Sequence, residues 1–313
     1  MNIGFSFISK EWLQCLEKSF DNLKLDIIQI WREGELVGAM PCFIYGKKII
    51  QPPSIPYMGP LIAPAASNKY SRIESNLHKF CNVLIRELLK SKYEYICFNA
   101  FPDLIDIRSF IWKNWNINVR YTYLVDFRNI DLKELWNIVD HNSRTQVRKA
   151  EKEGVVIKIE EELPEIYDIY RKQFSPKRPS RLILKKKQIE EIYYTMKKEN
   201  CLKCYCAYTK NNELISFYIA AIDNKRAYLW LGGINNKFKN TQATSLMYWE
   251  IIKDLFGKVD HLDLVGANIY DIALFKRDFA THIIPFYQVE LYSKSANEIA
   301  HVLKKHIARR KSE

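Results

Sequence analysis

The chain has 313 residues, of which 48% are hydrophobic and 13% aromatic, and this composition predicts one large or two medium folded domains and excludes intrinsic disorder. A net charge of +12 favours anionic partners such as nucleic acid, phosphorylated small molecules or an anionic membrane face, but solubility alone explains it equally well. No apolar run reaches the roughly 20 residues that span a bilayer, the N-terminus lacks a signal-peptide pattern, and the seven cysteines have no disulfide-scaffold spacing, so a cytoplasmic location is expected.

The first half of the chain is predicted to begin with a helix and three strands and to end with a helix, a strand, a helix and a strand. Apolar periodicity and turn residues place these elements at residues 9–20, 25–32, 36–44 and 48–51, then within 70–89 and at 93–98, 104–115 and 119–127. A boundary is expected near residues 128–131, with the next helix starting at Leu132.

The second half repeats most of this order. The expected elements are a strand at 155–159, helices at 164–174 and 185–199 joined by a loop at 175–181, strands at 201–208, 214–222 and 227–234, a helix at 242–256, a strand at 259–265, a helix at 270–279, a strand at 284–292 and a closing helix at 295–310. The shared order predicts a tandem duplication of one α/β unit, with domains at residues 1–128 and 129–313.

Four stretches carry residues that suggest chemistry: residues 55–61, 141–155, 235–251 and 262–280. In the first, proline and glycine fix a bend that presents Tyr57 on a loop. In the second, Asn142 or Ser143 is a natural helix start, Gly154 is a natural stop, and a spacing of four aligns Arg144 with Arg148.

Together these stretches resemble the FemAB family of peptidoglycan-bridge aminoacyltransferases and related GNAT-like N-acyltransferases. The family has a Tyr–Gly–Pro loop, an Arg-rich helix ahead of Gly-Val, and a closing Asp-Leu…Gly…Phe-Lys-Arg motif, and the likeness extends from about Pro53 to Tyr292. It implies two GNAT-like domains, each with a mixed, mostly antiparallel sheet flanked by helices. The chain departs from the family at Met58, where an arginine is usual, and at Asp278 and Ala280, where glycines are usual.

The resemblance places Lys276 and Phe275 at the reacting carbonyl, with the lysine steadying an oxyanion or donor phosphates and the phenylalanine shaping the pocket. A surface lysine beside a core phenylalanine is the plainer interpretation. Asp263 ends a predicted strand where a general base would sit, although an aspartate there more often caps the next turn. No Ser-His-Asp or Cys-His set is apparent, so direct attack by the amine is expected.

Three further residues are candidate substrate contacts. Arg144 and Arg148 would hold an anionic phosphate, either of the acceptor or of nucleic acid, and Tyr57 would contact the acceptor across the cleft between the domains. The alternatives are a solvated helix face paired with Glu151 and Glu153, and an ordinary half-buried loop tyrosine.

The loop before the helix at 242–256 bears on the donor. Acyl-CoA enzymes of the GNAT type present a glycine-rich loop here, whose backbone N–H groups bind pyrophosphate, but residues 235–245 contain no glycine. This favours aminoacyl-tRNA over acyl-CoA as the donor, with Lys237, Lys239 and Gln242 as donor contacts. No tightly bound cofactor is expected.

No metal is expected either. Cys201, Cys204 and Cys206 have neither a second cysteine pair nor a nearby histidine, so a tetrahedral zinc site is incomplete and core packing is favoured.

The sequence therefore predicts a transferase that moves an aminoacyl or other acyl group onto an amine of a phosphorylated cell-wall or surface-glycan precursor. The first domain would shape the acceptor site, the second would carry the chemistry, and transient contact with an anionic membrane at the inner face is a further expectation. One alternative is an acyl-CoA-dependent N-acyltransferase of an amino sugar in surface-polysaccharide assembly. A second is an inactive basic protein that binds RNA or a membrane surface with the same fold.

Overall fold

The computed structural model describes residues 6–53, 55–173 and 184–293. The predicted loop at 175–181, the last residue of the predicted helix at 164–174 and the predicted helix at 295–310 lie outside these ranges. In the first half the elements are η1 (Ser6–Ile8), α1 (Lys10–Ser19), β1 (Leu23–Arg32), β2 (Glu35–Tyr45), β3 (Lys48–Ile50), β4 (Leu61–Ile62), α2 (Tyr70–Lys90), β5 (Tyr95–Asn99), α3 (Arg108–Ile111) and β6 (Asn116–Asp126).

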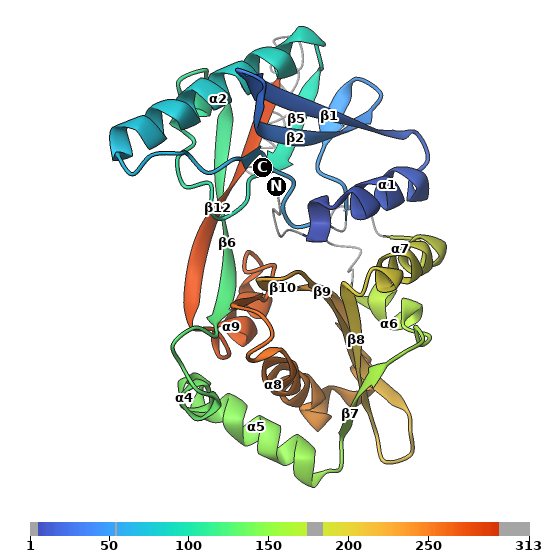
Figure 1. Cartoon of the computed structure of the whole chain (residues 1–313). Coiled ribbons are helices and arrows are strands. Elements are labelled where there is room, and N and C mark those ends of the chain that lie inside the picture. The colour runs from blue at the N-terminus through green and yellow to red at the C-terminus, as the bar shows by residue number, and fades with distance from the viewer. Residues whose placement is uncertain (1–5, 54, 174–183, 294–313) are drawn as a thin grey trace, which may run out of the picture.

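The second half follows the predicted order closely. Its elements are α4 (Leu132–Ile138), α5 (His141–Lys152), β7 (Val156–Glu160), α6 (Tyr167–Lys172), α7 (Lys186–Lys198), β8 (Leu202–Tyr208), β9 (Leu214–Ile222), β10 (Arg226–Ile234), η2 (Asn236–Thr241), α8 (Ala243–Leu255), β11 (His261–Asp263), α9 (Tyr270–Arg277) and β12 (His282–Tyr292). All strands join one mixed sheet in the order β1-β2-β3-β5-β12-β6-β11-β10-β9-β8-β7, and β4 pairs with β2 off this path (Figure 1).

The two halves repeat one topology. Each contains one parallel pair whose strands are connected by a helix, β3–α2–β5 in the first half and β10–α8–β11 in the second. All other strand pairs in the described residues are antiparallel. The predicted architecture, two units of mixed, mostly antiparallel strands flanked by helices, is confirmed.

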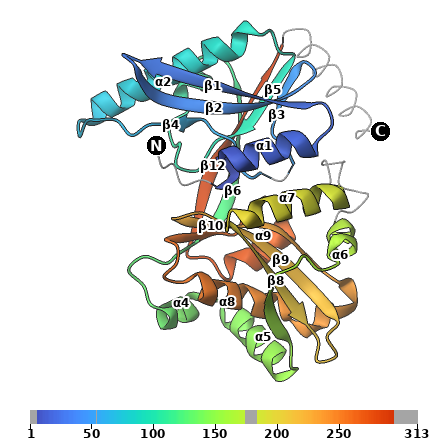
Figure 2. The same ribbon diagram turned by 45° about the vertical axis from the view of Figure 1, so that its right-hand side comes forward.

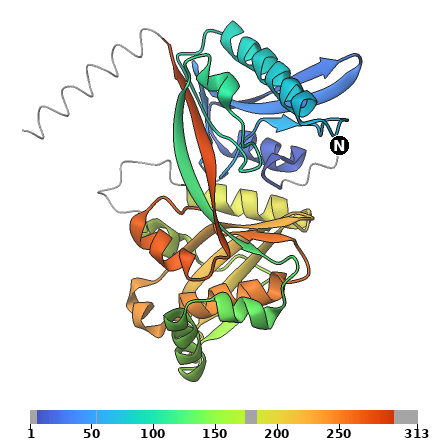
Figure 3. The same cartoon turned by 90° about the vertical axis from the view of Figure 1, so that its left-hand side faces the viewer.

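The last strand of each half is exchanged with the other. β12, from the end of the second half, pairs with β5 of the first half, and β6, from the end of the first half, pairs with β11 of the second. Between them β6 and β12 pair antiparallel over nine residues from Asn116 to Leu124, and this long twisted ribbon connects the halves (Figure 3). The exchange makes the sheet continuous. The predicted domain boundary between residues 128 and 129 stays a prediction.

Three of the differences from the predicted boundaries have a cause that is visible in the structure. The helix predicted at 104–115 is reduced to α3, because the Asp106 carboxylate accepts a hydrogen bond from the backbone N–H of Arg108 and Asn114 has a φ of 58°. The strand predicted at 259–265 is reduced to β11, which ends just before a positive-φ residue, Val265. Helix α5 begins earlier than Asn142, because Asp140 caps it, and it ends at the predicted stop at Gly154.

Two apolar cores cover the opposite faces of the second half's strands. One lies between these strands and helices α5 and α8. The other is shared between the halves, where Phe7 and Trp12 of the first half meet Tyr228 and Trp230 of β10 edge-on at centroid distances of 5.0 and 5.1 Å. Helices α1 and α7 lie side by side at this junction (Figure 2). Packing through one shared core fixes how the halves sit relative to each other.

The longest described helix, α2, has 21 residues and carries charged residues along its length. None of the helices in the described ranges combines the length and the apolar character needed to cross a membrane.

Candidate functional site

The strands β10 and β11 separate where the predicted chemistry would lie. They pair in parallel only from Arg226 to Tyr228 on β10 and from His261 to Asp263 on β11. Strand β10 then continues to Ile234, with a register shift between Leu229 and Leu231 in its pairing with β9. Within the described residues, no strand pairs with the β11-facing edge of β10 beyond the shared three residues. The unpaired edge leaves backbone groups that an extended ligand can bind.

Asp263 is the last residue of β11, and its carboxylate is buried at this fork. It accepts hydrogen bonds from the Tyr57 hydroxyl at 2.8 Å, the Thr122 hydroxyl at 2.5 Å and the backbone N–H of Val265 at 2.8 Å. Burial away from solvent raises the pKa of Asp263, and the three hydrogen-bond donors oppose this rise. Asp263 is therefore a buried carboxylate that accepts three hydrogen bonds from within the chain.

Tyr57 reaches Asp263 from the loop between β3 and β4. Its side chain is 1% exposed and packs edge-on against Phe286 at a centroid distance of 5.0 Å. Burial, reinforced by the nearby Asp263 charge, raises the pKa of Tyr57, which keeps its hydroxyl a proton donor. In this structure the Tyr57 hydroxyl therefore donates its hydrogen bond to Asp263, within the same chain. Its predicted contact with an acceptor stays a prediction.

Lys276 lies on α9 with its ammonium turned to the loop that follows β11. The Nζ donates to the carbonyl oxygen of Leu264 at 2.5 Å and to that of Val265. Desolvation lowers the pKa of Lys276 to about 8, with Asp263 acting in the opposite direction. An ammonium has three N–H bonds, so two hold the lysine in place and a third is left for a ligand.

The loop after β11 is held in an uncommon backbone conformation. Val265 has a φ of 52° and Gly266 a φ of 72°, and a β-branched residue rarely adopts the first of these. The side chain of Asn268 fixes the loop to β6, since its amide donates to the Tyr121 carbonyl and its oxygen accepts from the Tyr121 N–H, both at 2.9 Å. These two hydrogen bonds to β6 fix the loop so that the carbonyl groups of Leu264 and Val265 face Lys276.

Phe275 lies on the same helix but faces the second core. Its ring is 5.0 Å from that of Tyr248 and 5.5 Å from that of Phe279. It is half-buried, so it supports the helix that carries Lys276, and its predicted role in shaping the pocket stays a prediction.

The predicted arginines lie away from this cluster, both on helix α5. The Arg144 guanidinium donates to the carbonyls of Trp136 and Asn137 at 3.2 and 3.3 Å, at the C-terminal end of α4. Arg148 is exposed and stacks over the Trp136 ring at 5.6 Å. Their suggested partner Glu153 lies near Lys149 instead, at 3.7 Å.

The glycine-free loop forms the short helix η2 ahead of α8. Lys237 is exposed and pairs with Glu213 at 2.9 Å, and Lys239 is exposed. Gln242 has a φ of 56°, and its side-chain amide is 3.4 Å from the Asn240 carbonyl. These three residues therefore lie on the loop that precedes α8, separate from the buried acid.

Part of this loop's hydrogen-bonding capacity is already used. The side chain of Asn235 accepts from the N–H of Lys237 at 3.1 Å, and its carbonyl accepts from the N–H of Phe238 at 2.9 Å. The backbone N–H of Ala243, at the start of α8, contacts the Thr241 hydroxyl at 3.4 Å. Such internal bonds leave fewer N–H groups for a pyrophosphate.

Asp278, which stands where the FemAB family usually has a glycine, connects two helices. Asp278 caps the end of α9, accepts a hydrogen bond from the Ser143 hydroxyl at 3.0 Å, and through its carbonyl accepts from the Asp140 N–H at 2.9 Å. It thereby ties α9 to the start of α5.

The structure thus brings Tyr57, Asp263 and Lys276 together and leaves the arginines and the loop lysines apart. Sequence reasoning missed Thr122 and Asn268. A threonine in an alternating strand carries no distinguishing signal, whereas Gly266 followed closely by Asn268 is a turn pattern that would have singled out the loop.

Comparisons with known proteins agree with this architecture. Residues 139–277 match the model of the acetyltransferase (GNAT) domain. No curated protein matches the chain by sequence.

Similar solved structures share the fold across nearly the whole chain. FemX is 13% identical, with a TM-score of 0.63, covering 90% of this chain and 91% of its own. The C-terminal domain of a putative lysylphosphatidylglycerol synthetase from Agrobacterium fabrum is 12% identical, with a TM-score of 0.57 and coverages of 96% and 92%. L-PGS from Bacillus licheniformis is 11% identical, with a TM-score of 0.53 and coverages of 94% and 94%. Residues 139–277 therefore form a GNAT-type acyltransferase domain, and the chain as a whole shares with FemX a fold of two joined GNAT units.

Proposed function

We propose that the protein transfers an aminoacyl group from aminoacyl-tRNA to an amine of a phosphorylated cell-wall or surface-glycan precursor. The observation that carries this proposal is the Lys276 ammonium, held by two backbone carbonyls at the fork of β10 and β11 and close to the buried Asp263. A positively charged hydrogen-bond donor that is fixed where the two strands separate would stabilise an oxyanion formed there.

The transfer is a direct displacement. The neutral amine nitrogen of the acceptor attacks the donor's carbonyl carbon, a C–N bond forms, and the carbonyl oxygen becomes an oxyanion. The third N–H of Lys276 donates to this oxygen. The oxyanion then collapses, the C–O bond to the ribose breaks, and the proton lost by the amine goes to the departing ribose oxygen.

Asp263 supports this step through its charge. Its carboxylate oxygens are engaged by Tyr57, Thr122 and Val265, so it is poorly placed to accept a proton from a substrate. Its negative charge raises the pKa of Lys276 and so favours the ammonium form that the oxyanion needs. We therefore assign it the role of a counter-charge rather than that of a general base.

The loop ahead of α8 supports tRNA as the donor. It has no glycine, and Asn235 and Thr241 already engage several of its N–H groups. Lys237 and Lys239 are exposed in this loop and would bind RNA phosphates. Such binding depends on positive charge and does not need a loop of free backbone N–H groups.

For the acceptor we propose that Arg148 supplies the phosphate contact. It is exposed and stacked on Trp136, which leaves its N–H groups free to bind a phosphate, whereas Arg144 is engaged with the end of α4. The first half would shape the rest of the acceptor site through the loop that carries Tyr57.

A second candidate function keeps the enzyme and changes the donor. The matching family model is that of an acetyltransferase domain, and this favours acyl-CoA as the donor; the acceptor that we propose for this candidate is an amino sugar. The chemistry at Lys276 would be the same, with a C–S bond broken in place of the C–O bond.

A thermal-shift panel separates the two donors, because a ligand that binds the folded state raises the melting temperature. We expect a rise with charged tRNA that exceeds the rise with uncharged tRNA, and no rise with acetyl-CoA. Lys276→Ala should lose the difference between charged and uncharged tRNA, and the matched variant Lys113→Ala, at an exposed lysine of the first half, should keep it. A rise with acetyl-CoA alone would support the second candidate, and no rise with any donor would contradict both.

A further inference from the structure

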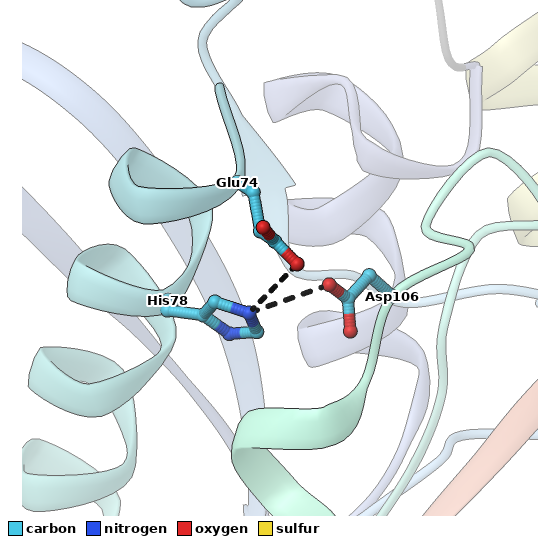
Figure 4. Close-up of side chains that lie close together, drawn as sticks. All are labelled: Glu74, His78 and Asp106. Atoms are coloured by element: carbon cyan, nitrogen blue, oxygen red, sulfur yellow. Dashed lines mark ion pairs between the residues drawn. The ribbon is translucent and has the colours of Figure 1, made fainter. Parts of the chain in front are cut away.

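A histidine and two carboxylates converge in the first half, on elements other than the helix that carries Lys276. Glu74 and His78 lie one turn apart on α2, and Asp106 lies in the segment that precedes α3. Their side chains point toward one another (Figure 4). One ligand atom from each lies within 4.8 Å of the others, and this is the one such group of three or more among the described residues.

The separations between these atoms fit a shared ion. The His78 Nε2 is 3.4 Å from an Asp106 oxygen and 3.9 Å from a Glu74 oxygen, too far for good hydrogen bonds. Two ligands that each lie about 2.1 Å from one tetrahedral zinc ion are about 3.4 Å apart. Within the described residues the Nε2 is shielded from solvent and has no hydrogen-bond partner.

The histidine ring is already oriented for binding. Its Nδ1 is 2.8 Å from the hydroxyl of the buried Ser109, and its face packs on Trp112 at a centroid distance of 4.8 Å. A hydrogen bond on one ring nitrogen fixes the direction of the other, as it does for most metal-binding histidines. The Nε2 therefore points into the space between the two carboxylates.

Arg108 is the cation that the carboxylates contact in this structure. Its guanidinium binds Asp106 at 2.7 Å and also contacts Glu74. The arginine side chain is 47% exposed, so it is free to turn toward solvent, and ion pairs of such exposed groups contribute little to stability. A divalent metal ion could replace the Arg108 guanidinium as the positive charge that both carboxylates bind.

We propose that Glu74, His78 and Asp106 form a zinc-binding site, with water as the fourth ligand. An imidazole ligand favours Zn²⁺ over Mg²⁺ and Ca²⁺, which prefer oxygen ligands. The expectation of no metal was based on the cysteine spacing, and these three ligands are too scattered in the chain to form a recognisable motif.

The bound ion would brace the first half at its junction with the second. It would tie α2 to the segment that runs from Phe101 to Asp106. Phe101 packs on Tyr57 at a centroid distance of 5.8 Å, and Asp103 lies 3.4 Å from Arg226 on β10. Zinc should therefore stabilise the folded chain without taking part in the transfer.

Calorimetric titration of the full chain with ZnCl₂ tests this proposal, with Co²⁺ as a visible-absorption probe of the ligands. We expect one site, a rise in melting temperature with Zn²⁺ but not with Mg²⁺, and at least tenfold weaker binding in His78→Gln. His141→Gln changes an exposed histidine of the second half and should bind zinc like the wild type. Arg108→Gln removes the competing cation and should bind zinc more tightly.

Two results would overturn the proposal. The first is zinc binding of equal affinity in the wild type and His78→Gln. The second is no binding in either the wild type or Arg108→Gln, provided that circular dichroism shows both to be folded. In that case the cluster is a network of ion pairs only.

Discussion

Replacing Lys276 by methionine tests whether its ammonium is desolvated in the folded chain. The pKa of this lysine falls from 10.5 to about 8 in the folded chain, which corresponds to a cost of about 3 kcal/mol for keeping it charged. Methionine is similar in length and carries no charge, so the substitution removes this cost. It also leaves the Leu264 and Val265 carbonyls without their donor, which costs about 1–3 kcal/mol each at any pH.

The dependence on pH separates these two effects. Below pH 8 the lysine is protonated in both the folded and the unfolded chain, so the full cost of burying the charge weakens the wild type. Between pH 8 and 10.5 the unfolded chain binds more protons, so the free energy of unfolding of the wild type rises with pH relative to that of Lys276→Met. The rise should reach about 3 kcal/mol and be mostly complete by pH 10.

Urea unfolding of both proteins at intervals from pH 6.5 to 10 measures this difference directly. Lys237→Met, at an exposed lysine, controls for the substitution itself and should show a nearly constant difference from the wild type. If the difference between the wild type and Lys276→Met also stays constant over this range, the ammonium is not desolvated and its assigned role loses its basis.

Two further substitutions test the surroundings of the lysine, and a third tests Arg144 on α5. Tyr57→Phe removes a donor from the buried Asp263 and should lower the free energy of unfolding by about 1–3 kcal/mol, as measured by urea unfolding; a change below about 0.5 kcal/mol would contradict the hydrogen bond. Asn268→Ala releases the loop from Tyr121 and should lower kcat more than tenfold while KM for the donor changes little, and an unchanged kcat would show that the loop needs no such tie. Arg144→Met removes hydrogen bonds to the end of α4 and should cost about 1 kcal/mol of stability with acceptor affinity unchanged, whereas a large loss of that affinity would assign the phosphate contact to Arg144.

Much of the fold follows from local patterns. A mostly apolar run after a hairpin turn signal predicted β9 at its observed bounds, Leu214–Ile222, and helical periodicity predicted α8 to within one residue at each end. Such patterns are local, and a positive φ or a capping side chain alters them, as at Asp106 and Val265. The repeated element order was enough to predict two similar units.

The exchange of strands was beyond local patterns. Nothing in the residues of β12 tells whether it pairs with β5 or with β11, because pairing depends on where the halves meet in space. The same limit applies to the candidate site. Asp263 and Lys276 were singled out from a motif, but the hydrogen bond from Tyr57, which lies 206 positions away in the chain, became visible only in the folded structure.

The central claim, that the Lys276 ammonium promotes acyl transfer, is tested most directly by a transfer assay over a range of pH. The wild type and Lys276→Arg would each be given radiolabelled aminoacyl-tRNA and a muropeptide amine, and the rate of label transfer measured from pH 6.5 to 9.5. Deprotonation of the acceptor amine affects both proteins alike, so the ratio of the wild-type rate to the variant rate isolates the lysine. We expect this ratio to fall as pH rises through about 8, where Lys276 loses its proton, since arginine stays charged. A ratio that stays constant over this range would contradict the role assigned to this lysine.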